Sequence, residues 1–579
     1  MTFLKKYKIG EIIPRLTAAF MVVLLYSLLK TSESFTEISF YNEINFVVFL
    51  LCVIALFFIL CIVKNDTAIN VTAIFLTLLY FICAASMKRE YYFSIGLCAV
   101  MCILVAFFNF DGIKLKLKNK SVRLAVALFI IAFTLFVGLI CCLYYKNYKT
   151  PCYDFGLFSQ MFWYMKETGE CLITCERDAL LNHFAVHFSP IYYLILPIYI
   201  IIPSPCTLLV LQALIVASGL IPLSLISKRY NLSALGTILF SVCYILYPGF
   251  MGGCFWYLHE NCFLLPLLLW YLYFSEKEKI FPTVFFALLT LTVKEDAAVY
   301  VALIALYFIF SRKNYKCNLF ILFFSVLYFV TVTKLMSVYG EGVMSDSRYG
   351  EYIYDDSGLF SVIKSVIQNP IFAIYQIFKE EKFLFILQML CPLGFLPLLI
   401  KKPEKLILFI PLILVNLMTN YPYQHDIGFQ YTFGSGAILF YLSVTNYSES
   451  GKNRSKILLC GVLSAVIIFS GGYLSKITYV EEYISATQQR EVIDEALKLV
   501  PEDASVAAST RLVANLSERE VIYELETTKQ NAEYIVFDLR NSEEKSNLEK
   551  YLNDRYTILF YEEEIICVFK NNELICSPD

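Results

Sequence analysis

The chain has 579 residues, a formal net charge of −2 and a mean hydropathy of +0.64. Hydrophobic residues make up 58% of it and charged residues 17%, whereas a soluble domain carries about 25% charged residues. This composition excludes a soluble enzyme, a disordered chain and a secreted disulfide scaffold, and the small net charge gives no field that would draw nucleic acid.

Apolar runs recur from Ile12 to Leu474 and predict an all-α polytopic membrane protein. Basic loops mark the cytoplasmic side of such proteins, and the strongest one here runs from Lys114 to Arg123. Placing the basic loops inside predicts about fifteen spans, a cytoplasmic N-terminus and a location in the cell membrane. The predicted spans are 12–30, 44–63, 68–86, 91–110, 122–143, 205–227, 232–248, 262–275, 280–293, 297–310, 319–338, 381–400, 406–419, 432–445 and 457–475.

Three regions follow from this topology. Residues 1–115 are expected to form an N-terminal four-span module, and residues 116–476 a larger membrane module with external loops. The composition changes sharply near residue 477, and residues 477–579 are expected to form a small extracytoplasmic α/β domain. Its expected elements are a helix at 489–499, a strand at 504–508, a helix at 511–517, strands at 521–525 and 534–539, a helix at 543–553, and a hairpin of 556–561 with 564–569. A disulfide between Cys567 and Cys576 is left open.

One apolar segment, His187–Pro203, cannot be a full span, because it would place the basic residues that follow it on the outer side of the membrane. Ser189-Pro190 is typical of an N-cap followed by proline at the first helical position. We therefore predict a half-helix from Pro190 to Ile202 at the outer face, whose unpaired backbone N–H groups would form an anion site.

The histidines gather on the predicted outer side. The chain has four of them, and all map to external loops: His183, His187, His259 and His425. Scarce histidines also avoid apolar spans for purely structural reasons. Here, however, His259 precedes Glu260 and His425 precedes Asp426. Clusters of histidines and carboxylates bind divalent metals or supply acid–base groups, so these loops are candidates for a site.

Asp154 lies just after the fifth predicted span, in the sequence Tyr-Asp-Phe-Gly. The aromatic-rich stretch Phe155–Lys166 that follows suits a helix lying along the membrane interface. Many loop aspartates are only turn formers or caps. An acidic residue at the membrane edge beside an interfacial helix also suits a general base acting on a substrate delivered from lipid.

Lys294-Glu295-Asp296 interrupts two apolar runs with almost no loop between them. The structural explanation is an ordinary polar turn. Charges enclosed so tightly are costly, however, and are usually functional. The functional role would be contact of Lys294 with a lipid-linked phosphate, oriented by a carboxylate, and Arg348 in a later external loop is a second phosphate candidate.

A structural zinc site is the weaker interpretation of four other residues. Cys171 and Cys175 are followed by His183 and His187, but the gap between the pairs is shorter than in zinc fingers. The predicted helix start at Ser189 also competes for His187.

Together these motifs resemble domain-of-unknown-function family 2079, a family of predicted membrane proteins. The matching features are Tyr153–Gly156, His183-Phe184, His187–Pro190, Phe255–Glu260, Lys294–Asp296 and Tyr423–His425. The resemblance covers roughly residues 120–579. That family is in turn similar to the GT-C superfamily of integral membrane glycosyltransferases, which use polyprenyl-phosphate-linked sugars at the outer face.

The resemblance implies an inverting glycosyltransferase with a lipid-linked sugar donor in the bilayer and an unidentified acceptor. Asp154 would be the catalytic base, and the substrate would contact Lys294, Glu295, Asp296, Arg348, His183 and His425. A divalent metal (Mn, Mg or Zn) would bind His187, His259 and Glu260, because Asp154 is followed by Phe155 rather than a second carboxylate. The alternatives are a transporter or flippase for a lipid-linked saccharide, or a cell-envelope scaffold.

Overall fold

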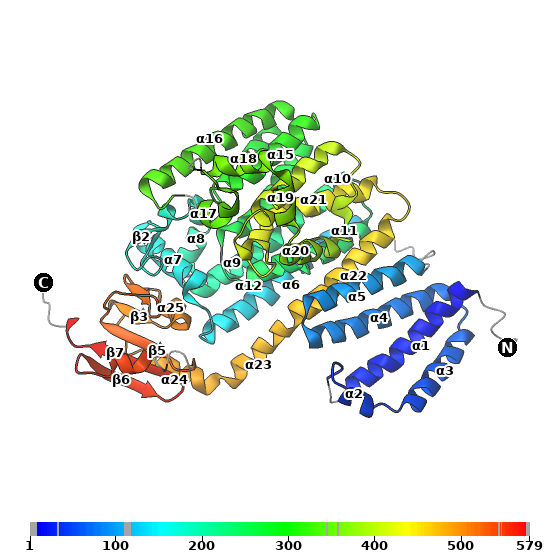
Figure 1. Ribbon diagram of the computed structural model, residues 1–579, viewed down its shortest axis with the longest axis horizontal. Coiled ribbons are helices and arrows are strands. Elements are labelled where there is room, and N and C mark those ends of the chain that lie inside the picture. The colour runs from blue at the N-terminus through cyan, green and yellow to red at the C-terminus, as the bar shows by residue number, and fades with distance from the viewer. Residues whose placement is uncertain are drawn as a thin grey trace.

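The computed structural model describes residues 8–31, 34–108, 117–342, 345–355, 358–541, 545 and 547–574. Lys114 of the basic loop and Cys576 lie outside these residues. The described chain is mostly helical, with one small mixed sheet near the C-terminus. The N-terminal helices and the C-terminal sheet lie at opposite ends of the molecule, with the larger helical body between them (Figure 1).

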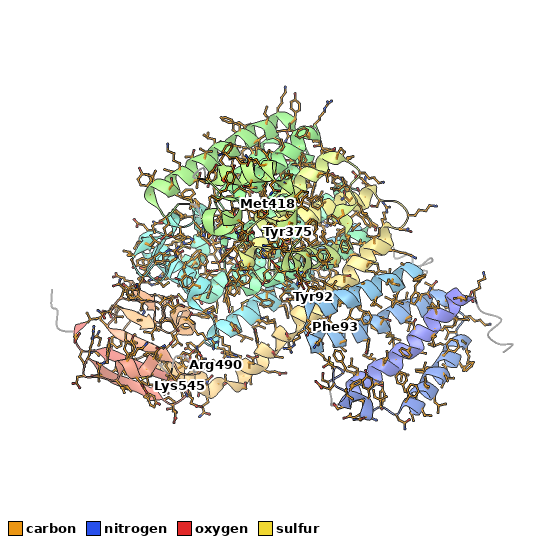
Figure 2. All side chains as sticks on the ribbon, viewed as in Figure 1. Tyr92, Phe93, Tyr375, Met418, Arg490 and Lys545 are labelled. Atoms are coloured by element: carbon orange, nitrogen blue, oxygen red, sulfur yellow. The ribbon has the colours of Figure 1, made fainter. Side chains whose placement is uncertain are left out.

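The N-terminal helices are long apolar runs, except for the four-residue α2. They are α1 (Ile9–Lys30), α2 (Ser39–Asn42), α3 (Phe46–Ile62), α4 (Asp66–Lys88) and α5 (Tyr91–Phe107). The Asn45 side chain accepts hydrogen bonds from backbone N–H groups at the start of α3, and Asn65 does the same for α4. Tyr92 and Phe93 mark the start of α5 (Figure 2), where the Tyr92 hydroxyl donates to Glu380 of the helical body at 3.4 Å.

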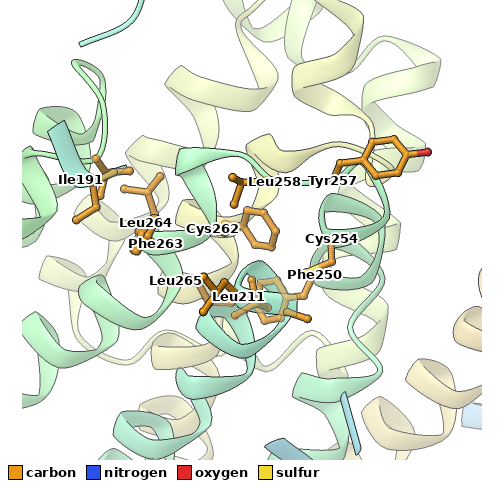
Figure 3. Packing of buried hydrophobic residues seen from close by; sticks show 14 of the residues in the cluster. Ile191, Leu211, Phe250, Cys254, Tyr257, Leu258, Cys262, Phe263, Leu264 and Leu265 are labelled. Carbon is orange, nitrogen blue, oxygen red and sulfur yellow. The ribbon is translucent and has the colours of Figure 1, made fainter. Parts of the chain in front are cut away.

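The helical body contains most of the remaining apolar helices. They are α6 (Asn119–Lys146), α9 (Pro205–Ser218), α10 (Leu220–Arg229), α11 (Ala234–Ile245), α12 (Pro248–Phe255), α13 (Leu264–Glu276), α14 (Ile280–Leu291), α15 (Ala297–Phe310), α16 (Tyr315–Tyr339), α20 (Glu380–Leu390), α21 (Phe433–Glu449) and α22 (Arg454–Gly472). One large apolar cluster joins them. Figure 3 shows part of it, with Phe250 and Cys254 of α12 near Leu211 of α9 and Leu265 of α13.

Within the described residues, seven helices are long and apolar enough to cross a membrane, so the predicted count of about fifteen spans is not confirmed. Three regions differ from the predicted spans and loops. The predicted span 406–419 contains no α-helix and consists of the 3₁₀ helix η9 (Pro403–Phe409) and the π-helix η10 (Leu412–Leu417). Residues expected to open an external loop at 248 form the buried helix α12 instead. The predicted span 381–400 is α-helical only to Leu390 and continues as the 3₁₀ turn η7 (Cys391–Leu393). This turn ends at Gly394, which has a φ of +58° and lies so close to Ile457 that a β-carbon would meet its carbonyl oxygen at 2.4 Å.

Short elements connect the body helices, and all of them except η10 lie wholly or partly in segments that the sequence assigns to the outside. They are η2 (Cys152–Gly156), α7 (Leu157–Thr168), β1 (Leu172–Ile173), β2 (Leu181–Asn182), η3 (His183–Ala185), η4 (Pro190–Leu194), α8 (Leu196–Ile201), η5 (Glu260–Phe263), α17 (Ser345–Tyr349), η6 (Gly350–Tyr352), α18 (Leu359–Gln368), α19 (Pro370–Ile377), η10 (Leu412–Leu417), η11 (Pro422–His425) and η12 (Gln430–Thr432). The functional candidates lie on these elements.

The predicted half-helix after Ser189 is wrong in its details. The segment begins as the 3₁₀ turn η4 and continues as the short helix α8, and the Ser189 side chain makes no capping hydrogen bond. The nearby backbone N–H groups are already paired, because Phe188 donates to Glu295 at 3.2 Å and Ile191 donates to the Thr292 carbonyl at 2.9 Å. The expected anion site is therefore filled by a carboxylate of the chain itself.

The C-terminal domain follows most of the predicted order of elements. Helices α23 (Thr478–Ser485) and α24 (Thr487–Leu497) lead from α22 to a five-stranded sheet of order β4-β3-β5-β7-β6 (Figure 1). The elements are β3 (Val506–Ala508), α25 (Thr510–Leu516), β4 (Ile522–Glu524), β5 (Tyr534–Asp538), η14 (Glu549–Tyr551), β6 (Tyr556–Glu562) and β7 (Ile566–Asn571). Strand β3 is parallel to β4 and β5, and the hairpin β6–β7 adds antiparallel strands to β5. Helix α23 was not predicted, and the predicted helix at 543–553 lies partly outside the described residues, with the 3₁₀ turn η14 in its described part.

The C-terminal domain docks on the loop after α6. The Gln160 side chain on α7 is fully buried and donates to the backbone carbonyls of Arg519 and Glu520 at 3.3 and 3.2 Å. It also accepts from the Thr174 backbone N–H at 2.8 Å, and the Thr174 hydroxyl donates to the Ile522 carbonyl at 2.7 Å. Helix α7 was expected along the membrane interface, but most of its residues are buried, and Ser159, Gln160 and Tyr164 bond to the C-terminal domain.

We expect Gln160→Ala to loosen this docking. Each buried polar group left without a partner costs about 1–3 kcal/mol, so residues 477–574 should detach more often and be cleaved faster by trypsin. Limited proteolysis of the purified protein measures this, with Glu167→Ala, an exposed position on the same helix, as the matched control. Equal cleavage rates for the two variants would contradict the docking role.

Candidate functional site

The centre of the candidate site is the carboxylate of Glu260 at the start of η5. This side chain is fully buried. The Lys294 ammonium lies 2.9 Å from Oε1, the His259 ring 3.0 Å from Oε2, and the Tyr192 hydroxyl donates to Oε2 at 2.6 Å. Only the Tyr192 contact is a hydrogen bond: among the described residues Glu260 Oε1, Lys294 Nζ and His259 Nδ1 have no hydrogen-bond partner, so these groups meet as ion pairs. A buried carboxylate is tolerated when opposite charges and a donor surround it.

Electrostatics keep this pair charged. Burial alone would raise the pKa of Glu260, but the charges of His259 and Lys294 outweigh it and hold the pKa well below its ordinary value. Burial lowers the pKa of Lys294, yet the carboxylates of Glu260 and Glu295 outweigh it and raise the pKa. Both groups are therefore ionised at neutral pH.

A second pair lies beside the first. His187 Nδ1 is 3.0 Å from the Glu295 carboxylate, and Glu295 also accepts from the Phe188 backbone N–H at 3.2 Å. Because Lys294 and Glu295 are consecutive, the turn between α14 and α15 joins the two pairs. We call Glu260, Lys294, His259, Glu295 and His187 the ionic cluster.

Three residues of the ionic cluster, His187, Lys294 and Glu295, line a cavity of about 310 Å³, which we call cavity A. Its polar lining residues are His187, Lys294, Glu295, Asp296, Arg348, Gln424, Tyr349 and Tyr431. Its apolar lining residues are Val299, Phe329, Val362, Ile363, Leu414 and Val415, which come from α15, α16, α18 and η10. The cavity is thus amphiphilic, because its lining combines charged side chains with aliphatic and aromatic ones.

Two further charges face cavity A. The Arg348 guanidinium lies over the ring of Tyr421 at 4.3 Å and over that of Tyr431 at 5.2 Å, and within the described part of the chain it forms no ion pair. Asp296 Oδ1 is buried and lacks a hydrogen-bond partner among the described residues. Burial raises the pKa of Asp296 to about 6.

Asp154 lies on another side of this site. It is not among the residues that line cavity A, and its Oδ2 accepts a hydrogen bond from the Trp256 indole at 2.9 Å. The Trp256 ring packs on Phe429 at 4.3 Å, Phe429 on Tyr423 at 4.4 Å, and Tyr423 on Tyr421 at 4.9 Å. These four rings, which we call the aromatic wall, run from Asp154 to Arg348.

The other two histidines lie apart from each other. His183 is buried, its Nδ1 is 3.3 Å from Glu176, and its ring contacts that of His187 at 6.0 Å. His425 is in η11 beside Gln424, and burial lowers its pKa to about 4. His183 therefore adjoins the ionic cluster through a ring contact, whereas His425 lies behind a residue of the cavity lining.

The geometry does not fit a metal at His187, His259 and Glu260. The Lys294 ammonium and the His259 ring already lie against the two oxygens of Glu260, so a cation of the protein occupies that position. Nor do Cys171, Cys175, His183 and His187 share a centre: the Cys171 thiol points to the Tyr193 hydroxyl and that of Cys175 to Gln160. Among the described residues, no group of three or more histidine, cysteine or acidic residues is arranged to hold a metal ion.

Sequence reasoning missed several residues that complete the site. Tyr192 bonds to Glu260, Glu176 pairs with His183, and Tyr421 and Tyr431 flank Arg348. Tyr192 follows Ser189-Pro190 closely, so that motif could have indicated it as a site residue. The other two tyrosines gave no signal, because the chain contains 42 tyrosines.

Long apolar helices with a buried ionic cluster at their ends define a polytopic helical membrane protein. The model of the family described as "Predicted membrane protein (DUF2079)" matches residues 144–567. The chain belongs to this family, as its motifs predicted, and helices α1 to α5 lie outside the matched part. No curated protein matches the chain. Among solved structures, the crystal structure of ArnT from Cupriavidus metallidurans bound to undecaprenyl phosphate is similar at 10% identity and a TM-score of 0.48, covering 80% of this chain and 100% of that chain.

Proposed function

We propose that the protein is an inverting glycosyltransferase that takes a sugar from a polyprenyl-phosphate carrier and transfers it at the outer membrane face. The observation that carries this proposal is the amphiphilic character of cavity A. A polyprenyl phosphate has a charged head on a long apolar chain, and cavity A is lined by the cations Lys294 and Arg348 together with apolar side chains.

Arg348 is the principal phosphate ligand in this proposal. The charge of Lys294 is shared with Glu260, whereas Arg348 has no ion-pair partner among the described residues and projects a planar set of donors. Arginine binds phosphate through two parallel hydrogen bonds. The lipid chain would then follow Val299, Phe329 and Ile363 toward α16 and α18.

Asp154 is the proposed general base. It would accept the proton of the acceptor hydroxyl as that oxygen attacks the anomeric carbon, and the polyprenyl phosphate would leave with its charge stabilised by Arg348 and Lys294. A single displacement inverts the anomeric centre. The Trp256 indole holds one oxygen of Asp154 at 2.9 Å, which fixes the carboxylate for this role.

The donor is expected to bind more tightly below pH 6. Asp296 faces cavity A and its pKa of about 6 makes it neutral below that pH and negative above it, so rising pH adds a charge that repels the phosphate. The phosphate in a polyprenyl-phosphate sugar is a diester and keeps a constant charge. We expect about tenfold tighter binding at pH 5 than at pH 7.5, and Asp296→Asn should remove the difference, as measured by equilibrium binding of a polyprenyl-phosphate sugar.

The decisive experiment is a transfer assay. The purified full chain is incubated with a panel of polyprenyl-phosphate sugars and candidate acceptors, with divalent metal or with chelator, beside the Arg348→Gln variant. Turnover that falls sharply in the variant supports the proposal. Turnover that persists in chelator would agree with the geometry at Glu260, where the Lys294 ammonium lies in place of a metal ion. Donor binding without turnover under any condition would instead favour a transporter or flippase of lipid-linked saccharides.

A further inference from the structure

A second cavity, of about 410 Å³, lies between the helical body and the C-terminal domain. We call it cavity B. Its lining residues are Ile140, Cys141, Tyr144, Lys149, Pro151, Phe255, Trp256, Tyr257, Lys476, Tyr479, Thr510 and Arg511. They come from α6, the loop after it, the end of α12, the approach to α23, and α25. None of these residues takes part in the donor binding proposed above.

Cavity B carries an excess of positive charge. Lys149 is paired with Glu482. Lys476 and Arg511 have no carboxylate partner among the described residues, and the Lys476 ammonium instead lies over the rings of Tyr479 and Phe255 at 4.9 and 5.5 Å. Two cations that face a cavity without counter-charges favour an anionic ligand.

Aromatic faces provide the rest of its surface. Tyr144 and Tyr479 are stacked with their ring centres 4.9 Å apart, and Tyr144 also stacks on Tyr257 at 6.2 Å. Such rings give flat apolar surfaces edged by hydroxyl groups, a combination that suits the faces and hydroxyls of a sugar ring. The volume of about 410 Å³ is within the range of small-molecule sites.

Cavity B adjoins Asp154 through a shared residue. Trp256 lines the cavity and its indole nitrogen donates to Asp154 at 2.9 Å. The same ring begins the aromatic wall that runs toward Arg348 and cavity A. The Asp154 carboxylate therefore lies next to Trp256, with cavity B at that ring and cavity A at the far end of the wall.

We propose that cavity B binds an acidic saccharide, one bearing carboxylate or phosphate groups, and that this saccharide is the acceptor. Lys476 and Arg511 hold its negative charge, the tyrosine and tryptophan rings hold its sugar faces, and one hydroxyl approaches Asp154. Binding in cavity B stands on the geometry alone, whereas the acceptor role rests on the proposed glycosyltransferase function.

The test is calorimetric titration of the full chain in phosphatidylcholine nanodiscs with tetragalacturonate and with the neutral cellotetraose. We expect the acidic tetrasaccharide to bind at least about tenfold more tightly than the neutral one. The double variant Lys476→Gln/Arg511→Gln should lose at least about tenfold in affinity for tetragalacturonate. The matched control is Lys498→Gln/Lys529→Gln, which removes two exposed charges of the same domain and should leave the affinity unchanged.

Three results would overturn the proposal: equal affinity for the two tetrasaccharides, wild-type affinity in the Lys476/Arg511 variant, or an equal loss in the control variant. A further arm replaces part of the lipid with phosphatidylglycerol. Tetragalacturonate binding that survives supports a saccharide site, and binding that disappears assigns the cavity to a lipid headgroup instead.

This experiment is separate from the test of the donor. Arg348→Gln should retain tetragalacturonate binding, because Arg348 belongs to cavity A. If transfer is never observed but tetragalacturonate binds as described, the glycosyltransferase proposal fails and the acidic saccharide site remains. If transfer occurs and tetragalacturonate does not bind, the acidic saccharide site fails and the glycosyltransferase proposal remains.

Discussion

Asp154→Asn is expected to lower kcat for sugar transfer about a thousandfold, since the loss of a general base typically costs 10²–10⁴-fold. Asparagine keeps an oxygen that can accept the hydrogen bond from Trp256, which measures 2.9 Å in the structure. The fold should therefore be preserved. Steady-state kinetics with a saturating polyprenyl-phosphate sugar measure the effect.

A thermal unfolding curve of the same sample provides the control for Asp154→Asn. Wild-type thermal stability together with wild-type donor affinity would place the loss in the chemical step. If the variant kept more than about a tenth of the activity, Asp154 would not be the base. The carboxylates of the turn before α15 would then be the next residues to examine.

Lys294→Gln is expected to give the largest loss of stability at the site. It leaves the Glu260 carboxylate, which is fully buried, without the ammonium at 2.9 Å. Breaking a buried ion pair from one side costs about 3–5 kcal/mol, which should appear as a clear fall in the unfolding temperature. Donor affinity should also fall, because one of the two cations at the phosphate is removed.

The double variant Lys294→Gln/Glu260→Gln separates these two effects. Two neutral amides can pair, so most of the lost stability should return, whereas donor affinity should stay low. Lys279→Gln, an exposed lysine at the other end of α14, controls for the loss of a positive charge. Donor affinity restored in the double variant would show that Lys294 acts only through the fold.

The helices and the C-terminal domain followed from local pattern. Hydrophobic runs predicted nearly every apolar helix, and alternating apolar residues with turn signals predicted β5 and the hairpin β6–β7 within a residue or two. The tightly enclosed charges of Lys294–Asp296 were also found in this way, because a charged turn between two apolar runs is conspicuous. The number of spans was not settled, since several helices are shorter than a membrane is thick.

Partners in the site could not be predicted, because they depend on how distant loops meet. His187 and Glu295 are 108 positions apart, and Tyr192 and Glu260 are 68 apart. The sequence indicated that each residue mattered but not which one it would face. The metal site predicted at Glu260 arose for this reason, because no residue near Glu260 in the sequence indicates that Lys294 lies against it.

The docking of the C-terminal domain has a consequence for biosynthesis. Gln160 reaches its partner at Arg519 only after 359 further positions of the chain have been made. Until then, the Gln160 side chain has only the nearby Thr174 and Cys175 as partners among the described residues, and cavity B lacks the face contributed by Thr510 and Arg511. Contacts between such distant segments form late. An incompletely synthesised chain would therefore contain Asp154 and Trp256 before cavity B is complete, because Thr510 and Arg511 of its lining are made long after them.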